Sequence, residues 1–117
     1  MDISIEKKQG VTVIRLADRF DAYTAPAVKE KLLALQEGGQ VNVLVDLSAV
    51  DFVDSTGLAT LVAGLKHCRR AGGDLMLLGL QPRVRVIFGL TRLDHAFRIF
   101  DDEVEALKGF QKEDDAA

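Results

Sequence analysis

The residues most able to do chemistry lie together in the segment 51–57, which reads DFVDSTG. It holds two carboxylates, Asp51 and Asp54, followed by two adjacent hydroxyls, Ser55 and Thr56. At the start of a helix, a carboxylate or hydroxyl accepts a hydrogen bond from a free backbone N–H. A hydroxyl there can also carry a phosphoryl group, because a helix N-terminus favours negative charge. The segment is therefore either a helix cap, made by Asp54 or Ser55, or a phosphorylation switch.

Hydrolytic and metal chemistry find little support elsewhere in the chain. The run 54–57 differs in spacing from the aspartic-protease motif, and no second copy supplies a paired carboxylate. A nucleophilic Ser55 would need a glycine two residues earlier, where Val53 stands, and a histidine base. His67 falls roughly 18 Å further along the same predicted helix, and nothing in the sequence links His95 to Ser55. We therefore predict no catalytic residue, no metal and no cofactor.

Composition points to one globular domain. The chain has 117 residues, of which 48% are hydrophobic and 28% charged, with a net charge of -3. This acidic balance argues against direct binding of nucleic acid. The single cysteine, Cys68, excludes an internal disulfide and fits a reducing cytoplasm. No signal peptide and no apolar stretch of about 20 residues is visible, so we predict a cytoplasmic chain outside the membrane.

The elements that must position the 51–57 segment alternate between strands and helices. We predict strands at 4–9, 11–17, 41–47, 74–80 and 96–100, and helices at 24–37, 55–71, 82–90 and 103–110, with Thr24 capping the first helix. The order β-β-α-β-α-β-α-β-α predicts an α/β fold with a mixed, largely parallel sheet and an antiparallel edge hairpin. Apolar residues alternate on both faces of 41–47, so this strand is predicted to be central and covered on both sides.

Taken in order, several segments resemble the STAS domain family, of the bacterial anti-sigma factor antagonist type. They are LADRFDAYTAPAVKEKL at 16–32, the Asp-Ser-Thr-Gly turn at 54–57, the Gly-Gly pair at 72–73 and LTRLDHAFRIF at 90–100. The resemblance covers almost the whole chain, so we assign 1–110 to a STAS domain and expect 111–117 to be a disordered tail.

The resemblance implies a mechanism. In this family the hydroxyl after the turn aspartate, here Ser55, is phosphorylated by a serine/threonine kinase that is also the anti-sigma factor. The unphosphorylated protein binds the kinase and frees the sigma factor, phosphorylation ends the binding, and a PP2C-type phosphatase resets it. ATP belongs to the kinase, so this chain is not an enzyme. The residues implied in partner binding are Asp21, Asp54, Thr56, Gly57 and Leu58.

Some alternatives stay open. Asp21 and Asp54 equally suit a plain capping role. Where many members have Gly before the early Leu-Asp, this chain has Asp18-Arg19-Phe20, and Arg92 replaces the glycine of a late Thr-Gly-Leu-Asp. The family also implies a different function, that of an adaptor or scaffold in stress-sensing or lipid-transport complexes without a phosphoswitch. Binding of a small ligand such as a nucleotide at the turn is a third interpretation.

Overall fold

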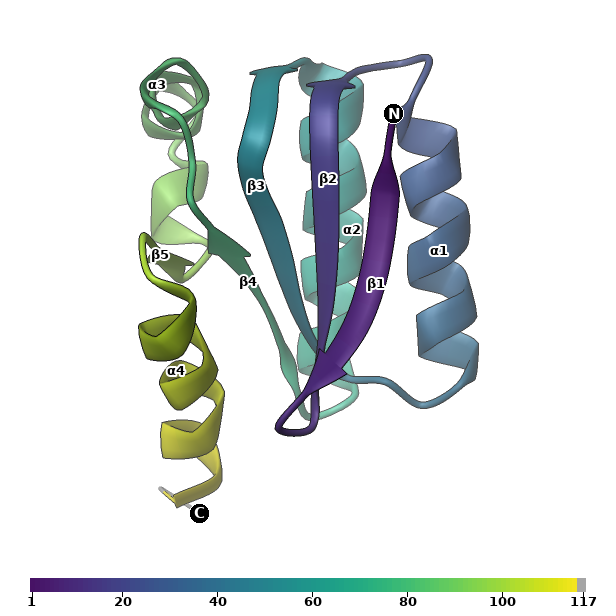
Figure 1. Ribbon diagram of the computed structural model, residues 1–117, viewed down its shortest axis with the longest axis vertical. Coiled ribbons are helices and arrows are strands. Elements are labelled where there is room, and N and C mark those ends of the chain that lie inside the picture. The colour runs from purple at the N-terminus through teal and green to yellow at the C-terminus, as the bar shows by residue number, and fades with distance from the viewer. Residues whose placement is uncertain (116–117) are drawn as a thin grey trace.

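The computed structural model describes residues 1–115 and confirms the predicted α/β fold (Figure 1). The strands are β1 (Ile3–Lys8), β2 (Val11–Phe20), β3 (Asn42–Val53), β4 (Asp74–Leu78) and β5 (Ile99–Phe100). The helices are α1 (Ala25–Glu37), α2 (Ser55–Arg70), α3 (Pro82–Leu90) and α4 (Glu103–Asp115), with a short 3-10 turn, η1 (Leu93–His95). In the described chain the five strands lie in the order β1-β2-β3-β4-β5. Strands β1 and β2 are antiparallel and every other neighbouring pair is parallel.

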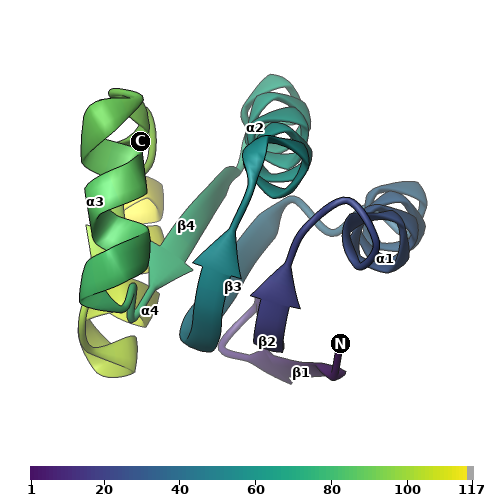
Figure 2. The same ribbon diagram turned by 90° about the horizontal axis from the view of Figure 1, so that it is seen from above.

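Helices cover both faces of the sheet, as the pattern of β3 predicts. Helices α1 and α2 lie side by side over one face, which Figure 2 shows from above. Together with α3 they enclose the larger core, which includes Val43, Val45 and Leu47 of β3. Leu44 points to the other face, where it packs with Met76 and with residues of α4 in a smaller core. Strand β3 is therefore central and buried on both sides.

Two strands are longer than their hydrophobic pattern indicates. Strand β3 continues to Val53, six residues beyond the predicted end at residue 47, so Val50–Val53 is strand. Val50 and Val53 are both buried, and Val53 stands opposite Phe20 at the end of β2. The exposed residues Ser48, Ala49 and Asp51 interrupt the apolar alternation, which explains why the pattern ends at residue 47.

The other predicted bounds agree to within a few residues, except that β5 is confined to Ile99–Phe100 and η1 occupies part of the predicted loop at 91–94. The predicted domain end at residue 110 and the disordered tail stay predictions. Helix α4 extends to Asp115, and residues 116 and 117 lie outside the described residues.

A cluster of charges fastens α4 to the sheet. Arg15 of β2 donates to Asp46 at 2.8 Å, to Glu103 at 2.7 Å and to Glu6 at 2.6 Å. Lys8 donates to the second oxygen of Glu103 at 2.6 Å. The pKa of Glu103 is lowered to about 2. The largest cause is the hydrogen bond from Arg15, and the next is the hydrogen bond from Lys8. Because Glu103 is the first residue of α4, this carboxylate holds the start of the helix against β1 and β2.

We expect Glu103→Gln to lower the free energy of unfolding at pH 7 by about 1 kcal/mol, since a partly exposed ion-pair network contributes modestly. The folded-state pKa of Glu103, about 2, is below its ordinary value of 4.5, so its contribution is complete above that value. The contribution is lost as pH falls from about 4.5 through about 2, and the difference between the variant and wild type should shrink over that window.

Urea denaturation of both proteins at pH 7, 4 and 2.5 measures the effect of Glu103. Glu105→Gln is the matched control, because Glu105 lies in the same first turn and, among the described residues, pairs with the exposed Lys108 alone. A difference between Glu103→Gln and wild type that stays constant across the three pH values contradicts the interpretation.

Candidate functional site

The Asp-Ser-Thr-Gly turn lies at the carboxyl edge of the sheet, beside a second loop. Strands β2 and β3 are parallel, and Phe20 and Val53 are paired at their ends. The loop from β2 into α1 and the turn from β3 into α2 therefore leave the sheet next to each other, at the upper edge in Figure 1. Ligands and partners of parallel α/β sheets are commonly bound at this edge.

Asp54 caps α2 and joins the two connections. Its Oδ1 accepts a hydrogen bond from the Gly57 N–H at 3.0 Å, and its Oδ2 accepts one from the Ala22 N–H at 3.0 Å. Its own N–H donates to the carbonyl of Phe20 at 3.2 Å. The structure thus decides between the two candidate caps in favour of Asp54. The same carboxylate holds the loop that contains Asp21, which the sequence could not show.

The two hydroxyls after the cap are exposed. Ser55 is the first residue of α2, and within the described part of the chain its hydroxyl has no hydrogen-bond partner. The Thr56 side chain is exposed as well, while its carbonyl accepts a hydrogen bond from the Thr60 hydroxyl at 2.9 Å. Because Asp54 already caps the helix, neither hydroxyl is needed for that purpose. Both are free to react or to contact a partner.

Gly57 and Leu58 are buried behind these hydroxyls. A Cβ added at Gly57 would lie 2.6 Å from the carbonyl oxygen of Phe20 and 3.1 Å from Val53. Glycine is therefore required for α2 to start so close to the end of β2. Leu58 is 9% exposed and packs in the larger core.

Asp21 shapes the neighbouring loop through its own carboxylate. It accepts hydrogen bonds from the backbone N–H groups of Tyr23 at 3.0 Å and Thr24 at 3.2 Å, and pairs with Arg19 at 3.2 Å. Partial burial acts to raise the pKa of Asp21, but the hydrogen bonds from Arg19, Tyr23 and Thr24 together lower it below its usual value. Asp21 thus stays ionised and keeps the loop folded.

The expected cap at Thr24 is wrong in its chemistry. Thr24 stands at the N-cap position of α1, but its side chain makes no capping bond to that helix. The hydroxyl instead accepts from the Asp21 N–H at 2.9 Å and donates to the Arg19 carbonyl at 2.8 Å. It is used inside the loop because Asp21 folds the chain back over it.

Sequence reasoning missed one residue of this edge, Tyr23. The residue is 94% exposed, the largest value among the exposed large hydrophobic residues of the described chain. An aromatic ring held in solvent on an ordered loop is typical of a protein contact surface. The signal in the sequence was an aromatic residue between the loop-forming Asp21 and Thr24.

Both departures from the family pattern fall at left-handed backbone positions. Asp18 has a φ of 73° and Arg92 a φ of 63°. Asp18 precedes Arg19, whose guanidinium lies 4.0 Å from the centre of the Phe52 ring. Arg92 follows the last turn of α3, where a glycine is the usual residue. Asp18 lies within β2 beside a register irregularity, and Arg92 lies just after α3, so both positions keep the conformation that glycine favours while presenting charged side chains.

The other chemical candidates lie apart from this edge. His67 is near the far end of α2 and His95 lies in η1. Burial raises the pKa of the Cys68 thiol to about 11, with a further contribution from the charge of Asp74, so the thiol is protonated and unreactive at neutral pH. The described residues contain no cluster of ligands for a metal ion. None of the described helices combines the length and the apolar character needed to cross a membrane.

Replacing Asp54 by alanine should lower the free energy of unfolding by about 2 kcal/mol, because it removes a helix cap and a bond between loops. Asp54→Asn keeps one of the two acceptor oxygens, so its free energy of unfolding should fall by less. Thermal and urea denaturation measure both variants. Asp51→Ala is the matched control, since Asp51 is exposed near the end of β3. If Asp54→Ala is no less stable than Asp51→Ala, the described role of Asp54 is wrong.

Comparison with known proteins places the fold and the turn in a family. The family model described as STAS domain matches residues 2–106. A protein named anti-sigma-B factor antagonist, from Listeria monocytogenes, is 39% identical over 108 residues, covering 90% of this chain and 95% of the relative.

Two solved structures of anti-sigma factor antagonists have a similar fold. An anti-sigma factor antagonist from Mycobacterium paratuberculosis has a TM-score of 0.86 at 27% identity, covering 94% of this chain and 93% of that one. SpoIIAA, an anti-sigma factor antagonist solved in its unphosphorylated form, has a TM-score of 0.82 at 21% identity, covering 95% of this chain and 97% of that one. At that identity the likeness to SpoIIAA concerns the fold.

Proposed function

The chain belongs to the STAS domain family, and from this premise we propose that it is an anti-sigma factor antagonist switched by phosphorylation of Ser55. Unphosphorylated, it binds an anti-sigma factor that is also a serine/threonine kinase, and so releases the sigma factor. The phosphorylated protein dissociates, and a PP2C-type phosphatase restores it. The chain acts in the cytoplasm as a binding protein and substrate, without a cofactor of its own.

One observation carries the proposal: Ser55 offers an exposed hydroxyl, with no partner in the described chain, on a turn that the hydrogen bonds of Asp54 hold in place. Asp54 performs the capping, so Ser55 can be modified without unfolding α2. A kinase reaches such a hydroxyl without opening the fold. At the first position of a helix a phosphate also meets a favourable dipole, so the folded domain tolerates it.

The phosphate changes the surface instead of the fold. It adds about −1.5 to −2 charges beside the carboxylate of Asp54, which its two hydrogen bonds keep in place. A partner that fits closely over the uncharged hydroxyl would then have to bury unpaired negative charge. Affinity falls for this reason.

The neighbouring residues take two kinds of role in this proposal. Asp21 and Asp54 fold the two loops, and the buried Gly57 and Leu58 set where α2 begins. These four residues affect partner binding indirectly, because they position the surface of this chain that contacts the partner. Thr56, together with the Tyr23 ring on the neighbouring loop, presents exposed side chains for direct contact.

Incubation with the cognate anti-sigma kinase and ATP, followed by peptide mass spectrometry, tests the assignment. We expect one phosphate, on Ser55. Thr56→Ala should be phosphorylated like wild type, and Ser55→Ala should not be phosphorylated. Phosphate on Thr56, or undiminished incorporation into Ser55→Ala, refutes the choice of acceptor.

A further inference from the structure

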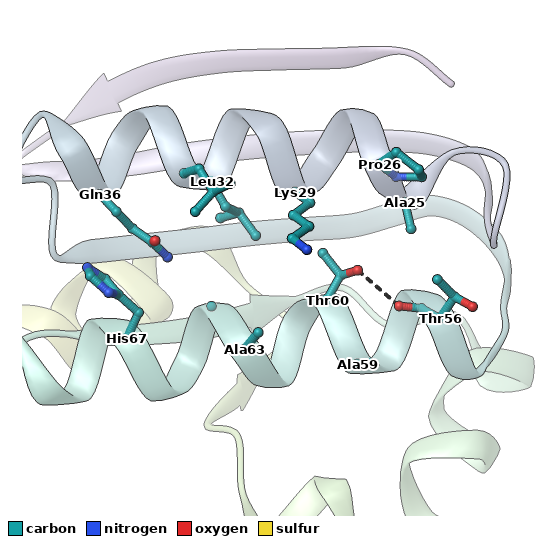
Figure 3. Close-up of a pocket in the computed structure, with 12 residues that line it drawn as sticks. Ala25, Pro26, Lys29, Leu32, Gln36, Thr56, Ala59, Thr60, Ala63 and His67 are labelled. Carbon is teal, nitrogen blue, oxygen red and sulfur yellow. Dashed lines mark hydrogen bonds between the residues drawn. The ribbon is translucent and has the colours of Figure 1, made fainter.

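A groove runs between α1 and α2 on the outer side of the domain, and it shares only Thr56 with the proposed contact surface of the switch. Its volume is about 500 Å³, within the range of sites for small molecules. It follows the two helices from Ala25 and Thr56 at one end to Gln36 and His67 at the other, as Figure 3 shows. At a rise of 1.5 Å per helical residue, the groove is roughly 17 Å long.

The floor of the groove is apolar and closed. Ala59, Ala63 and Gly64 of α2 leave space between the helices because their side chains are small or absent. A Cβ at Gly64 would lie 2.9 Å from Leu75 and 3.3 Å from Leu32, so these core residues seal the bottom. The groove therefore has walls and a floor, and an apolar chain that binds in it would be buried against them.

Lys29 is the charged side chain that lines the groove, and the polar side chains of Gln36, Thr56 and Thr60 are neutral. None of the lining residues is acidic, although the chain as a whole carries a net charge of -3. Within the described chain, Lys29 has no ion pair or hydrogen bond, and its ammonium points across the groove towards α2 (Figure 3). A neutral apolar ligand would strip water from this ammonium without replacing it, whereas a carboxylate would pair with it.

We propose that the groove binds a small anionic amphiphile, a monocarboxylate with an unbranched apolar chain. The carboxylate pairs with Lys29, and the chain lies over Ala59 and Ala63, beside Leu33 of α1. Leu33 is 47% exposed in the free protein and would be covered by the ligand. The site is independent of Ser55 phosphorylation, although Thr56 lies at its mouth.

Titration of the 15N-labelled chain with decanoate, below its micellar range, tests the site. We expect saturable shifts of the amide signals of Ala59, Ala63 and Gly64, with decanol binding about five- to tenfold more weakly. Lys29→Met should reduce decanoate affinity to that of decanol. Lys31→Met is the matched control, because Lys31 is exposed on the same helix but does not line the groove. Ala63→Phe, a substitution at an exposed position, should block binding while the spectrum stays that of a folded domain.

Other occupants give other results, and each overturns the proposal. Shifts at the groove amides on concentrating the protein without ligand would assign the groove to a second copy of the chain. Shifts only on adding the anti-sigma kinase would assign it to that partner. Absence of saturation with decanoate, or equal loss in Lys29→Met and Lys31→Met, would show that no carboxylate site exists.

Discussion

Ser55→Asp is expected to weaken binding to the cognate anti-sigma kinase by at least about 100-fold, or about 2.7 kcal/mol. Ser55 is exposed at the start of α2, next to the hydrogen-bonded carboxylate of Asp54. A second carboxylate there places unpaired charge in the contact surface, where burying it is costly. Isothermal titration calorimetry measures the affinity of wild type and variant.

Two controls separate charge at the switch from charge in general. Ser55→Ala should bind as tightly as wild type and should remain bound in the presence of ATP. Ser4→Asp should also bind like wild type, because Ser4 is exposed on β1, opposite Arg15 on the sheet face away from α2. The adaptor alternative predicts a complex indifferent to charge at residue 55, so equal affinities of Ser55→Asp and wild type would favour it.

Gly57→Ala is expected to have the second large effect, on stability and on recognition together. The added Cβ would lie 2.6 Å from the backbone oxygen of Phe20, which no side-chain rotation relieves. Overpacking of this kind costs roughly 1–3 kcal/mol of unfolding free energy. Because α2 must move away from β2 to relieve the contact, Ser55 moves with it, and phosphorylation by the kinase should slow at least about tenfold.

Gly38→Ala is the matched control for this glycine. A Cβ at Gly38 would make only ordinary contacts, 3.5 Å or more from the α1 carbonyl oxygens, and Gly38 lies at the opposite end of α1 from the switch. Urea denaturation and initial phosphorylation rates measure both variants. If Gly57→Ala matches Gly38→Ala in both assays, the close approach of α2 to β2 has no functional importance.

Local patterns were sufficient to predict most of the fold. Apolar residues on both faces of the third strand indicated a central strand, and α2 ends at Arg70, one residue before its predicted end. The hydrophobic pattern did not predict the end of the third strand, because pairing with a distant strand determines that end. The residues Val50–Val53 form strand because Val53 pairs with Phe20, more than thirty residues earlier in the chain.

The candidate site was predictable as a segment but not as a geometry. The sequence left Asp54 and Ser55 as equal candidates for the cap, because both side chains suit that position. The structure shows that Asp54 accepts the capping bond from the Gly57 N–H, and that the same carboxylate accepts a bond from Ala22, 32 residues away. Contacts of that kind, like the 88-residue separation of Arg15 and Glu103, arise only when the sheet assembles. Tyr23 was not predicted as a site residue for the same reason, because its exposure is a property of the folded loop.

The most direct test of the switch compares one preparation of the protein in three states. Calorimetric titration of the cognate anti-sigma kinase is carried out with the unmodified chain, with the chain phosphorylated on Ser55, and with that chain after treatment with a PP2C-type phosphatase. We predict tight binding, a loss of at least about 100-fold, and full recovery, in that order. Equal affinity of the unmodified and Ser55-phosphorylated chains would contradict the account.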